Sequence, residues 1–271
     1  MRLMNRRPSR GAALALALIP FALLLIAYAV GSEMRLAANP NDKLLPAAST
    51  VLEAVKRIAF TPDPRSGEYL MLADTIASLS RLLAALLIAT SVGLAFGLLI
   101  GLVPFARALL APLVAVVCMI PPLAVLPILF IVMGLGEGSK IALIAVGITP
   151  FIIRDLALRA EEIPAEQLIK AQTLGASTWQ VALRVMLPQL LPRLIDAERF
   201  SIGPAFLFLI AAEAIASESG LGYRIFLMRR YLAMDVILPY VAWITLLAFL
   251  MDAGLRLLQR RAFPWFGERA R

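Results

Sequence analysis

The strongest constraint in this sequence is the length of its uncharged apolar segments. No charged residue lies between Arg81 and Arg107, and the stretch from Gly11 to Ser32 is also free of charge. About 20 apolar residues in a helix cross the hydrocarbon core of a bilayer, where a helix satisfies its own backbone polar groups. Because 61% of the residues are apolar and the mean hydropathy is +0.86, we expect an integral membrane protein.

The distribution of these segments predicts six transmembrane helices. The first, at 11–32, follows the basic residues Arg2, Arg6, Arg7 and Arg10. A cleaved signal peptide is the alternative, because Ala27-Tyr28-Ala29 resembles a cleavage site. We expect an uncleaved span, since the apolar core is long and further spans follow. The other five spans are predicted at 75–103, 109–133, 141–158, 200–216 and 236–258.

The third predicted span contains Pro121, Pro122 and Pro127. Each proline leaves a backbone carbonyl without its helical partner, which is tolerated only where protein or water covers it. We therefore expect these prolines, together with Glu213 in the fifth span, to line a pathway or the bundle interior. A structural, hydrogen-bonded role is the alternative for Glu213.

The second and fourth predicted spans contain residues that indicate what lies next to them. Gly93, Gly97 and Gly101 recur at every fourth residue in the second span, a pattern that lets a neighbouring helix approach closely. The fourth span has only 13 residues between Lys140 and Arg154. Since this is short for a membrane helix, we expect Arg154 and Asp155 to snorkel or to lie in a wet interior.

The segments outside the spans complete a single predicted permease-like domain, 1–271. Residues 33–74 are expected on the non-cytoplasmic side and include a short amphipathic helix at 46–60. The core spans cover 75–258, and 259–271 is a tail. Lys and Arg are concentrated at both termini and at 154–199, which predicts that these parts are cytoplasmic.

The composition argues against most catalytic and metal sites. The chain has no histidine and one cysteine, Cys118, so the commonest general base and a cysteine metal site are excluded. No P-loop motif is present. The net charge of +8 comes from basic residues that flank apolar segments, which does not favour nucleic-acid binding.

A polar segment, 161–192, interrupts the apolar sequence and predicts a helical hairpin. Glu161, Glu162 and Pro164 favour the start of a first helix, which should end near Leu174 with Gly175 in the left-handed conformation. A second helix should start at once, because Ser177 and Gln180 form a capping box, and it should end at Pro188. Apolar contact points are expected from Leu168, Ile169, Leu174, Trp179, Leu183 and Met186.

Residues 171–188 of this hairpin, A-x-x-L-G-A-S-x-W-Q-x-x-x-R-V-x-L-P, resemble the "EAA" loop of ABC-importer permeases of the nitrate/sulfonate/taurine type. The segments I-P-P-L-A at 120–124 and G-L-G-Y at 220–223 also resemble this family, as does L-P-A-A-S-T-V-L at 45–52. The family's glutamate is absent, because its E-A-A triplet is replaced by Ile169-Lys170-Ala171. Glu166, one turn earlier, is a candidate substitute.

The resemblance implies a fold, a mechanism and a set of partners. The fold would be an all-α polytopic membrane protein of the type I importer class, with about six transmembrane helices and a cytoplasmic coupling-helix hairpin in a bacterial inner membrane. It would work as a homodimer in lipid, with a cytoplasmic ABC ATPase dimer and an external substrate-binding protein, by alternating access. ATP and Mg would be bound by the partner ATPase, and this chain would bind no cofactor and catalyse no reaction.

The resemblance also assigns residues. Contact with the ATPase is expected from Glu166, Ala171, Leu174, Gly175, Ala176, Ser177, Trp179, Arg184 and Pro188. At the outer face, substrate or the binding protein is expected to contact Tyr223, Arg224, Arg229 and Arg230, although interfacial anchoring or ion pairing explains these arginines equally well.

Several alternatives remain open for the function. A small oxyanion of the nitrate, taurine or sulfonate type is the first expectation for the cargo, and a urea- or guanidine-like nitrogen compound is the second. A secondary carrier or channel that works alone, with the hairpin as a surface anchor, is a different class. An intramembrane enzyme that depends on Glu213 or Asp252 is a third.

Overall fold

A computed structural model describes residues 8–40, 42–64 and 67–266 of the chain. It is 84% helical, and the described part contains no strand, which confirms the all-α prediction. Arg2, Arg6 and Arg7 lie outside these residues. The chain divides into two compact units, and the prediction of a single domain stays a prediction.

The first unit comprises the chain up to Leu70 and Leu227–Tyr240. It contains α1 (Arg10–Ala38) and α2 (Ala48–Phe60), so the short helix predicted at 46–60 is confirmed. The side chains of α1 hold the following loop, because Tyr28 donates a hydrogen bond to the carbonyl of Pro46 over 2.7 Å. Arg35 donates to Asp42 and, with the Leu44 amide, lowers the pKa of this carboxyl group.

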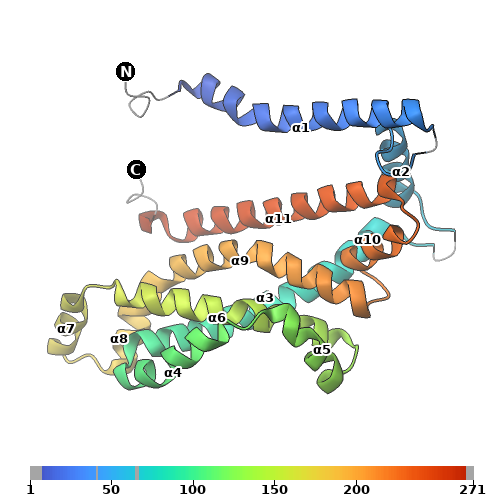
Figure 1. The fold of residues 1–271 in the computed structure, drawn as a ribbon. Coiled ribbons are helices and arrows are strands. Elements are labelled where there is room, and N and C mark those ends of the chain that lie inside the picture. The colour runs from blue at the N-terminus through green and yellow to red at the C-terminus, as the bar shows by residue number, and fades with distance from the viewer. Residues whose placement is uncertain (1–7, 41, 65–66, 267–271) are drawn as a thin grey trace. The chain divides into compact units, whose positions relative to one another are not determined.

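The second unit comprises Met71–Phe226 and Val241–Arg271. Within it α6 packs chiefly against α9, and α3, α4 and α5 also contribute to the bundle (Figure 1). Its helices are α3 (Leu70–Leu102), α4 (Pro104–Val117), α5 (Pro122–Met133), α6 (Glu137–Glu161), α7 (Ala165–Thr173), α8 (Thr178–Val181), a π-helical segment (Ala182–Met186), α9 (Leu187–Ala216), α10 (Leu221–Arg229) and α11 (Met234–Ala262). Of these helices, α3, α10 and α11 extend into the first unit.

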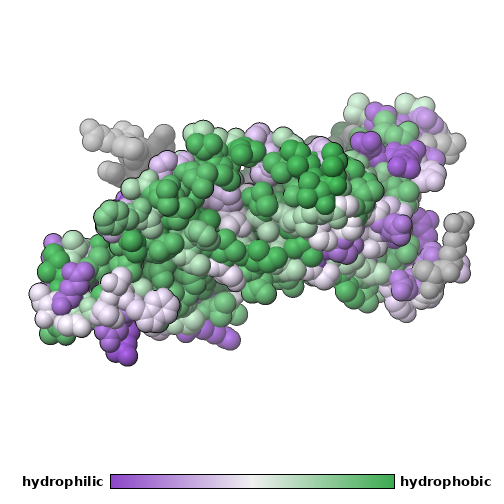
Figure 2. Space-filling model, turned by 90° about the horizontal axis from the view of Figure 1, so that it is seen from below, coloured by the Kyte–Doolittle hydropathy of each residue, from purple (hydrophilic) through white to green (hydrophobic). Residues whose placement is uncertain are grey.

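Five helical stretches among the described residues are long and apolar enough to cross a membrane: α1, α3, α6, the stretch from Thr178 to Ala216, and α11. The pair α4 and α5 gives a sixth if it is one span. Apolar side chains cover much of the face shown in Figure 2. Helices in contact with lipid are expected to expose such side chains.

The third predicted span, 109–133, is not one continuous helix. Instead α4 and α5 meet at an angle of 94°, and the helical hydrogen bonds stop between Val117 and Pro122. The cause is Pro121 followed by Pro122, since neither has a backbone N–H to donate and a residue before a proline avoids the α conformation. The region predicted as the third span thus consists of two helices, which form either one broken span or a re-entrant loop.

The helix of the fourth predicted span begins earlier in the chain than predicted and is longer. α6 begins at Glu137, four residues before Ile141, and has 25 residues. Lys140 lies inside it because its ammonium group pairs with Glu137 over 2.8 Å, so its charge does not end the helix. Arg154 is exposed and Asp155 is half-buried, as expected for charged side chains that reach a polar region.

The close approach predicted for the glycines of α3 is confirmed. A Cβ atom at Gly97 would lie 2.6 Å from the Cβ of Leu156, and one at Gly101 would lie 2.2 Å from the Cβ of Ala160. Larger residues would therefore push α3 away from α6. The matching order of these contacts shows that α3 and α6 run in the same direction, so both start at one end of the unit and finish near the hairpin.

Candidate functional site

The first arm of the hairpin begins later than predicted. Glu161 is the last residue of α6 and does not start the hairpin helix. The chain then turns, and α7 starts at Ala165, directly after Pro164. Glu166 is exposed in the first turn of α7, where a carboxylate is favourable next to the free backbone N–H groups.

The turn between the two arms has the predicted geometry. Gly175 has a φ of 81°, and the amide of Ala176 donates to the carbonyl of Ala171 over 3.0 Å, which closes the end of α7. Ser177 then caps α8: its hydroxyl accepts from the amide of Gln180, whose side chain accepts from the amide of Ser177. The predicted capping box and left-handed glycine are confirmed.

The second arm does not end at Pro188. It continues from α8 through the π-helical segment Ala182–Met186 directly into α9. Pro188 is in the first turn of α9, and the shift in hydrogen bonding at the preceding π segment lets the helix continue past it. The fifth predicted span, 200–216, is therefore the second half of one helical stretch from Thr178 to Ala216.

The hairpin exposes large apolar side chains. Leu174 is 87% exposed, Trp179 is 70% exposed and Ile169 is 56% exposed. Met186, expected among the contact points, is instead fully buried in a core with Ala160, and Leu168 packs against that core. The remaining expected contact residues Glu166, Gly175, Ser177, Arg184 and Pro188 are exposed, whereas Ala171 and Ala176 are half-buried.

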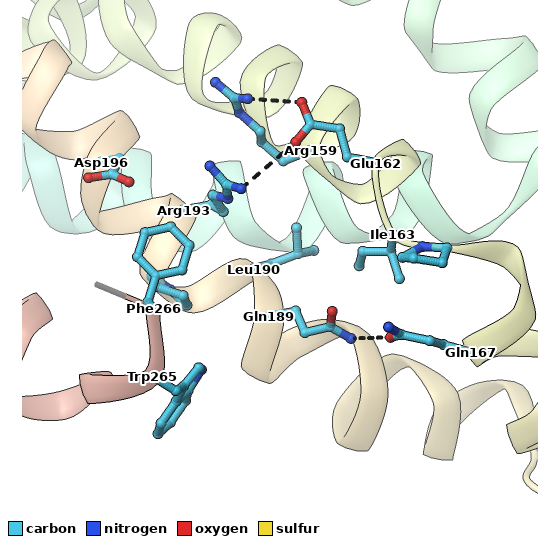
Figure 3. A pocket seen from close by; sticks show the side chains of 12 residues that line it. Arg159, Glu162, Ile163, Gln167, Gln189, Leu190, Arg193, Asp196, Trp265 and Phe266 are labelled. Atoms are coloured by element: carbon cyan, nitrogen blue, oxygen red, sulfur yellow. Dashed lines mark hydrogen bonds and ion pairs between the residues drawn. The ribbon is translucent and has the colours of Figure 1, made fainter. Parts of the chain in front are cut away.

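A cavity of about 660 Å³ lies at the root of the hairpin, where α6, α7 and α9 meet the segment after α11 (Figure 3). Glu162 accepts from Arg159 over 2.9 Å and lies 4.0 Å from Arg193. Gln189 donates to Gln167 over 3.0 Å. These polar contacts fasten the hairpin to the ends of α6 and α9.

A second cavity, also of about 660 Å³, lies among α5, α6 and α9 and is mainly apolar. Its wall includes Phe151 and Asp155 of α6 and Phe200 and Ser201 of α9. Pro122, one of the prolines predicted to line a pathway, is part of the wall. We call this space the membrane cavity.

The other predicted pathway residues differ in their placement. Pro121 and Pro127 are exposed, so they are available to a pathway or to lipid. Glu213 has no exposed surface, so it does not line a pathway at the surface of this chain. The structure supports the alternative for Glu213, a hydrogen-bonded structural role.

Glu213 belongs to a group of interacting polar side chains at the end of the unit opposite the hairpin, all of them buried except Glu137. We call this group the Arg81 cluster: Ser78, Arg81, Glu137, Lys140 and Glu213. Arg81 donates to Glu213 over 2.6 Å and also donates to Glu137. Ser78 donates to Glu213 over 2.7 Å, and its hydroxyl accepts from the amide of Leu221. The cluster thus joins α3, α6 and α9 to the turn before α10.

The residues predicted at the outer face are only partly available there. Arg224 pairs with the buried Asp74 over 2.8 Å, and its side chain is 17% exposed, so it stabilises the structure and is not a free surface arginine. Tyr223 is half-buried, with the Arg224 guanidinium 5.8 Å from its ring. Arg229 and Arg230 are exposed.

The pairing of Arg81 with Glu213 is absent from the sequence predictions. A signal was present, because an ionisable residue inside each of two different spans favours a buried pair. The sequence predicts that Asp155 snorkels or lies in a wet interior, but it does not predict a particular cavity. Among the residues that the structure describes, no group of three or more acidic or cysteine side chains could hold a metal ion.

Comparison with known proteins identifies the family. Residues 82–264 match the family described as "binding-protein-dependent transport system inner membrane component". The chain belongs to this family. It is therefore a multi-pass inner-membrane permease subunit of an ABC importer, and the resemblance derived from the hairpin and the glycine turn is confirmed.

Individual relatives support this assignment. The permease is 40% identical over 192 residues to the taurine transport system permease protein TauC of Escherichia coli (strain K12), covering 71% of this chain and 70% of that protein. It is 32% identical over 190 residues to the bicarbonate transport system permease protein CmpB of Synechococcus elongatus, covering 69% and 68%.

A solved structure has a similar fold. A chain of the inward-facing MetNI methionine ABC transporter superimposes with a TM-score of 0.64 at 20% identity, covering 73% of this permease and 99% of that chain. The predicted importer-permease fold is thus confirmed at the level of architecture.

Proposed function

We propose that the hairpin is the docking element for a cytoplasmic ABC ATPase and that the permease imports a small sulfonate-type solute. The observation that carries the first part is the exposure of Leu174 and Trp179 at the tip of an ordered polar hairpin. Large apolar side chains exposed beyond the lipid are typical of an interface with another protein. A P-loop ATPase is the partner that this family of transporters requires.

The hairpin is continuous with a membrane helix, which allows it to transmit movement to the membrane part. Its second arm is continuous from Thr178 to Ala216, and its first arm is fastened at the root through Glu162 and Gln167. A displacement of the tip is therefore carried along α9 toward Glu213 and the Arg81 cluster. Alternating access would follow from ATP binding, which closes the ATPase dimer, and hydrolysis, which resets it.

The remaining parts of the proposal concern assembly and orientation. The permease would act as a homodimer, with both termini and the hairpin in the cytoplasm and an external binding protein on the opposite side. ATP and Mg would be bound by the ATPase, so the permease itself would catalyse no reaction. The concentration of Lys and Arg at the termini and the hairpin supports this orientation.

The cargo is inferred from the relatives. The taurine permease of Escherichia coli is 40% identical to this chain, whereas the bicarbonate permease of Synechococcus elongatus is 32% identical over a similar length. We therefore propose taurine or a related small sulfonate as the solute. Uptake driven by an ion gradient without ATP would instead favour a carrier that works alone.

Co-purification in mild detergent tests the docking proposal. The wild-type permease should retain its ATPase in stoichiometric amount. Trp179→Asp should abolish this association, because a charge would be buried at the interface, while Trp179→Phe should retain most of it. Gly175→Val should also weaken association through strain at a φ of 81°, whereas Gly175→Asn adopts this conformation more easily.

The membrane part must remain folded for this test to be informative. Elution of each variant as the same monodisperse detergent complex as wild type provides the control. Normal ATPase retention by both Trp179→Asp and Gly175→Val would contradict the docking proposal.

A further inference from the structure

We propose that the membrane cavity passes a cargo that carries a protonated amine beside its anionic group, and that Asp155 and Ser201 accept hydrogen bonds from this amine. This inference rests on the proposed sulfonate import and narrows its substrate class to small zwitterionic aminosulfonates. Simple oxyanions, including bicarbonate, would be poorly suited to the same cavity.

The cavity is of a size that suits a small solute and is poor in polar groups. Its volume is about 660 Å³, and its wall consists mainly of aliphatic and aromatic side chains such as Phe151, Phe200 and Phe208. Among the described residues that form the wall, Asp155 is the ionisable one. Its ion-pair partner Arg159 does not line the wall, so the carboxylate is the charged group that a solute in the cavity meets first.

The hydrogen-bonding groups of the cavity are acceptors. The Ser201 hydroxyl donates its hydrogen to the carbonyl of Ala197 over 2.8 Å, so its lone pairs remain for a ligand. Asp155 pairs with Arg159 through Oδ1 at 3.5 Å, and its side chain stays 39% exposed. An ammonium group, which has only donors, complements both residues.

Arg154 and Asp155 are neighbours in the sequence but lie on different sides of α6. Arg154 lines a separate small cavity next to α4 and interacts with Cys118, whereas Asp155 lines the membrane cavity against α9. The arginine that could attract an anion is thus absent from the cavity wall. A cavity evolved for a bare anion would be expected to show the opposite arrangement, since a carboxylate repels an anion and an arginine binds it.

Taurine combines the two groups that these observations require. Its sulfonate is anionic and its amine is protonated at neutral pH, so the molecule has no net charge. The carboxylate of Asp155 compensates the ammonium end when the solute leaves water for an apolar cavity. Ethanesulfonate has the same carbon chain and sulfonate but lacks the amine, and is therefore the matched probe.

The test is uptake by the complete importer in proteoliposomes, with the binding protein saturated by taurine or by ethanesulfonate. Asp155→Asn should lower taurine uptake about ten-fold, as expected for the loss of one charge-assisted hydrogen bond. The ratio of taurine to ethanesulfonate uptake should fall with it. Asp155→Glu should restore at least half of the wild-type rate, and Ser201→Ala should cost a few-fold.

Controls separate recognition from structure. Arg154→Gln changes the neighbouring charge on α6 outside the wall of the membrane cavity, so taurine uptake and basal ATP hydrolysis should both stay close to wild type. The Asp155→Asn permease should retain its ATPase in mild detergent as the wild type does, which excludes misfolding as the cause of its loss. An Arg154→Gln loss as large as that of Asp155→Asn would overturn the inference, as would equal loss of both solutes or wild-type taurine uptake in Asp155→Asn. If the wild type imports neither sulfonate, the proposed cargo itself is wrong.

Discussion

The two ends of the second unit place polar and apolar groups in opposite ways. At one end, the Arg81 cluster buries charges: Glu213 has no exposed surface, and the Arg81 side chain is 6% exposed. At the other end, the hairpin exposes apolar groups, with Leu174 at 87% and Trp179 at 70%. Burying a charge costs free energy unless the charge is paired, and exposing a large apolar side chain to water is also unfavourable. Ion pairs within the cluster offset the first cost, and a protein partner would offset the second.

The difference indicates different roles. The charges of the Arg81 cluster are mutually satisfied by ion pairs, a serine and backbone amides, so they fix the positions of three helices within one chain. Leu174 and Trp179 of the hairpin are instead largely exposed and suit a surface on another protein. The first end should therefore control stability, and the second should control association.

The largest loss of stability is expected from Glu213→Leu. It leaves Arg81 buried with one carboxylate fewer, and breaking a buried ion pair costs about 3–5 kcal/mol. The double variant Arg81→Met/Glu213→Leu should lose less than the sum of the single variants, because no charge is stranded. Thermal unfolding of the purified permease in detergent measures both, and additive losses would show that the two residues do not act as a pair.

A smaller loss is expected where α3 and α6 touch. Gly101→Ala places a methyl group against Ala160 and should cost about 1–3 kcal/mol through overpacking. Gly254→Ala, in a helix with open space around it, is the matched control and should cost nothing. The same thermal measurement compares them, and equal midpoints would contradict the close packing of α3 on α6.

A local effect of about 1 kcal/mol is expected from Ser177→Ala, because the capping hydroxyl of α8 is lost. Hydrogen exchange should accelerate at the amide of Gln180 and leave α9 beyond Leu190 unaffected. Ser177→Asp, which keeps a side-chain acceptor, should exchange like wild type. Acceleration spread along α9 would mean that the cap stabilises more than the hairpin.

The smallest effect on stability is expected at the most exposed aromatic residue of the hairpin. Trp179→Asp should change the free energy of unfolding by no more than about 0.5 kcal/mol, since the side chain is largely exposed in the isolated permease. The same variant should lose the ATPase. A large destabilisation of the isolated permease would contradict the account, because the hairpin would then control stability as the Arg81 cluster does.

The sequence predicted those features that depend on neighbouring residues. The capping box of Ser177 with Gln180 and the left-handed Gly175 follow from chemistry within four residues, and both are present. The amphipathic helix α2 follows from its periodicity. The family assignment relied on the same local segments and is correct.

The sequence did not predict the features that depend on distant partners. Arg81 meets Glu213 across 132 positions, and Glu137 pairs with Lys140 only because α6 begins earlier than hydropathy indicated. Pro188 predicts a helix end, although the π-helical segment before it lets α9 continue. The position of Asp155 in the membrane cavity depends on how α6 packs on α9, which no local pattern specifies.

The most direct test of the central claim is cross-linking from the tip of the hairpin. Cys118→Ser removes the one native cysteine, and Leu174→Cys then places a single thiol at the tip. In membranes that contain the complete transporter, a short thiol-to-amine cross-linker should join this position to the ATPase. The control is Phe60→Cys, which places the thiol at a similarly exposed position at the end of α2 and should give no such product. A tip that stays free of the ATPase, or reacts no more than Phe60→Cys, would contradict the account.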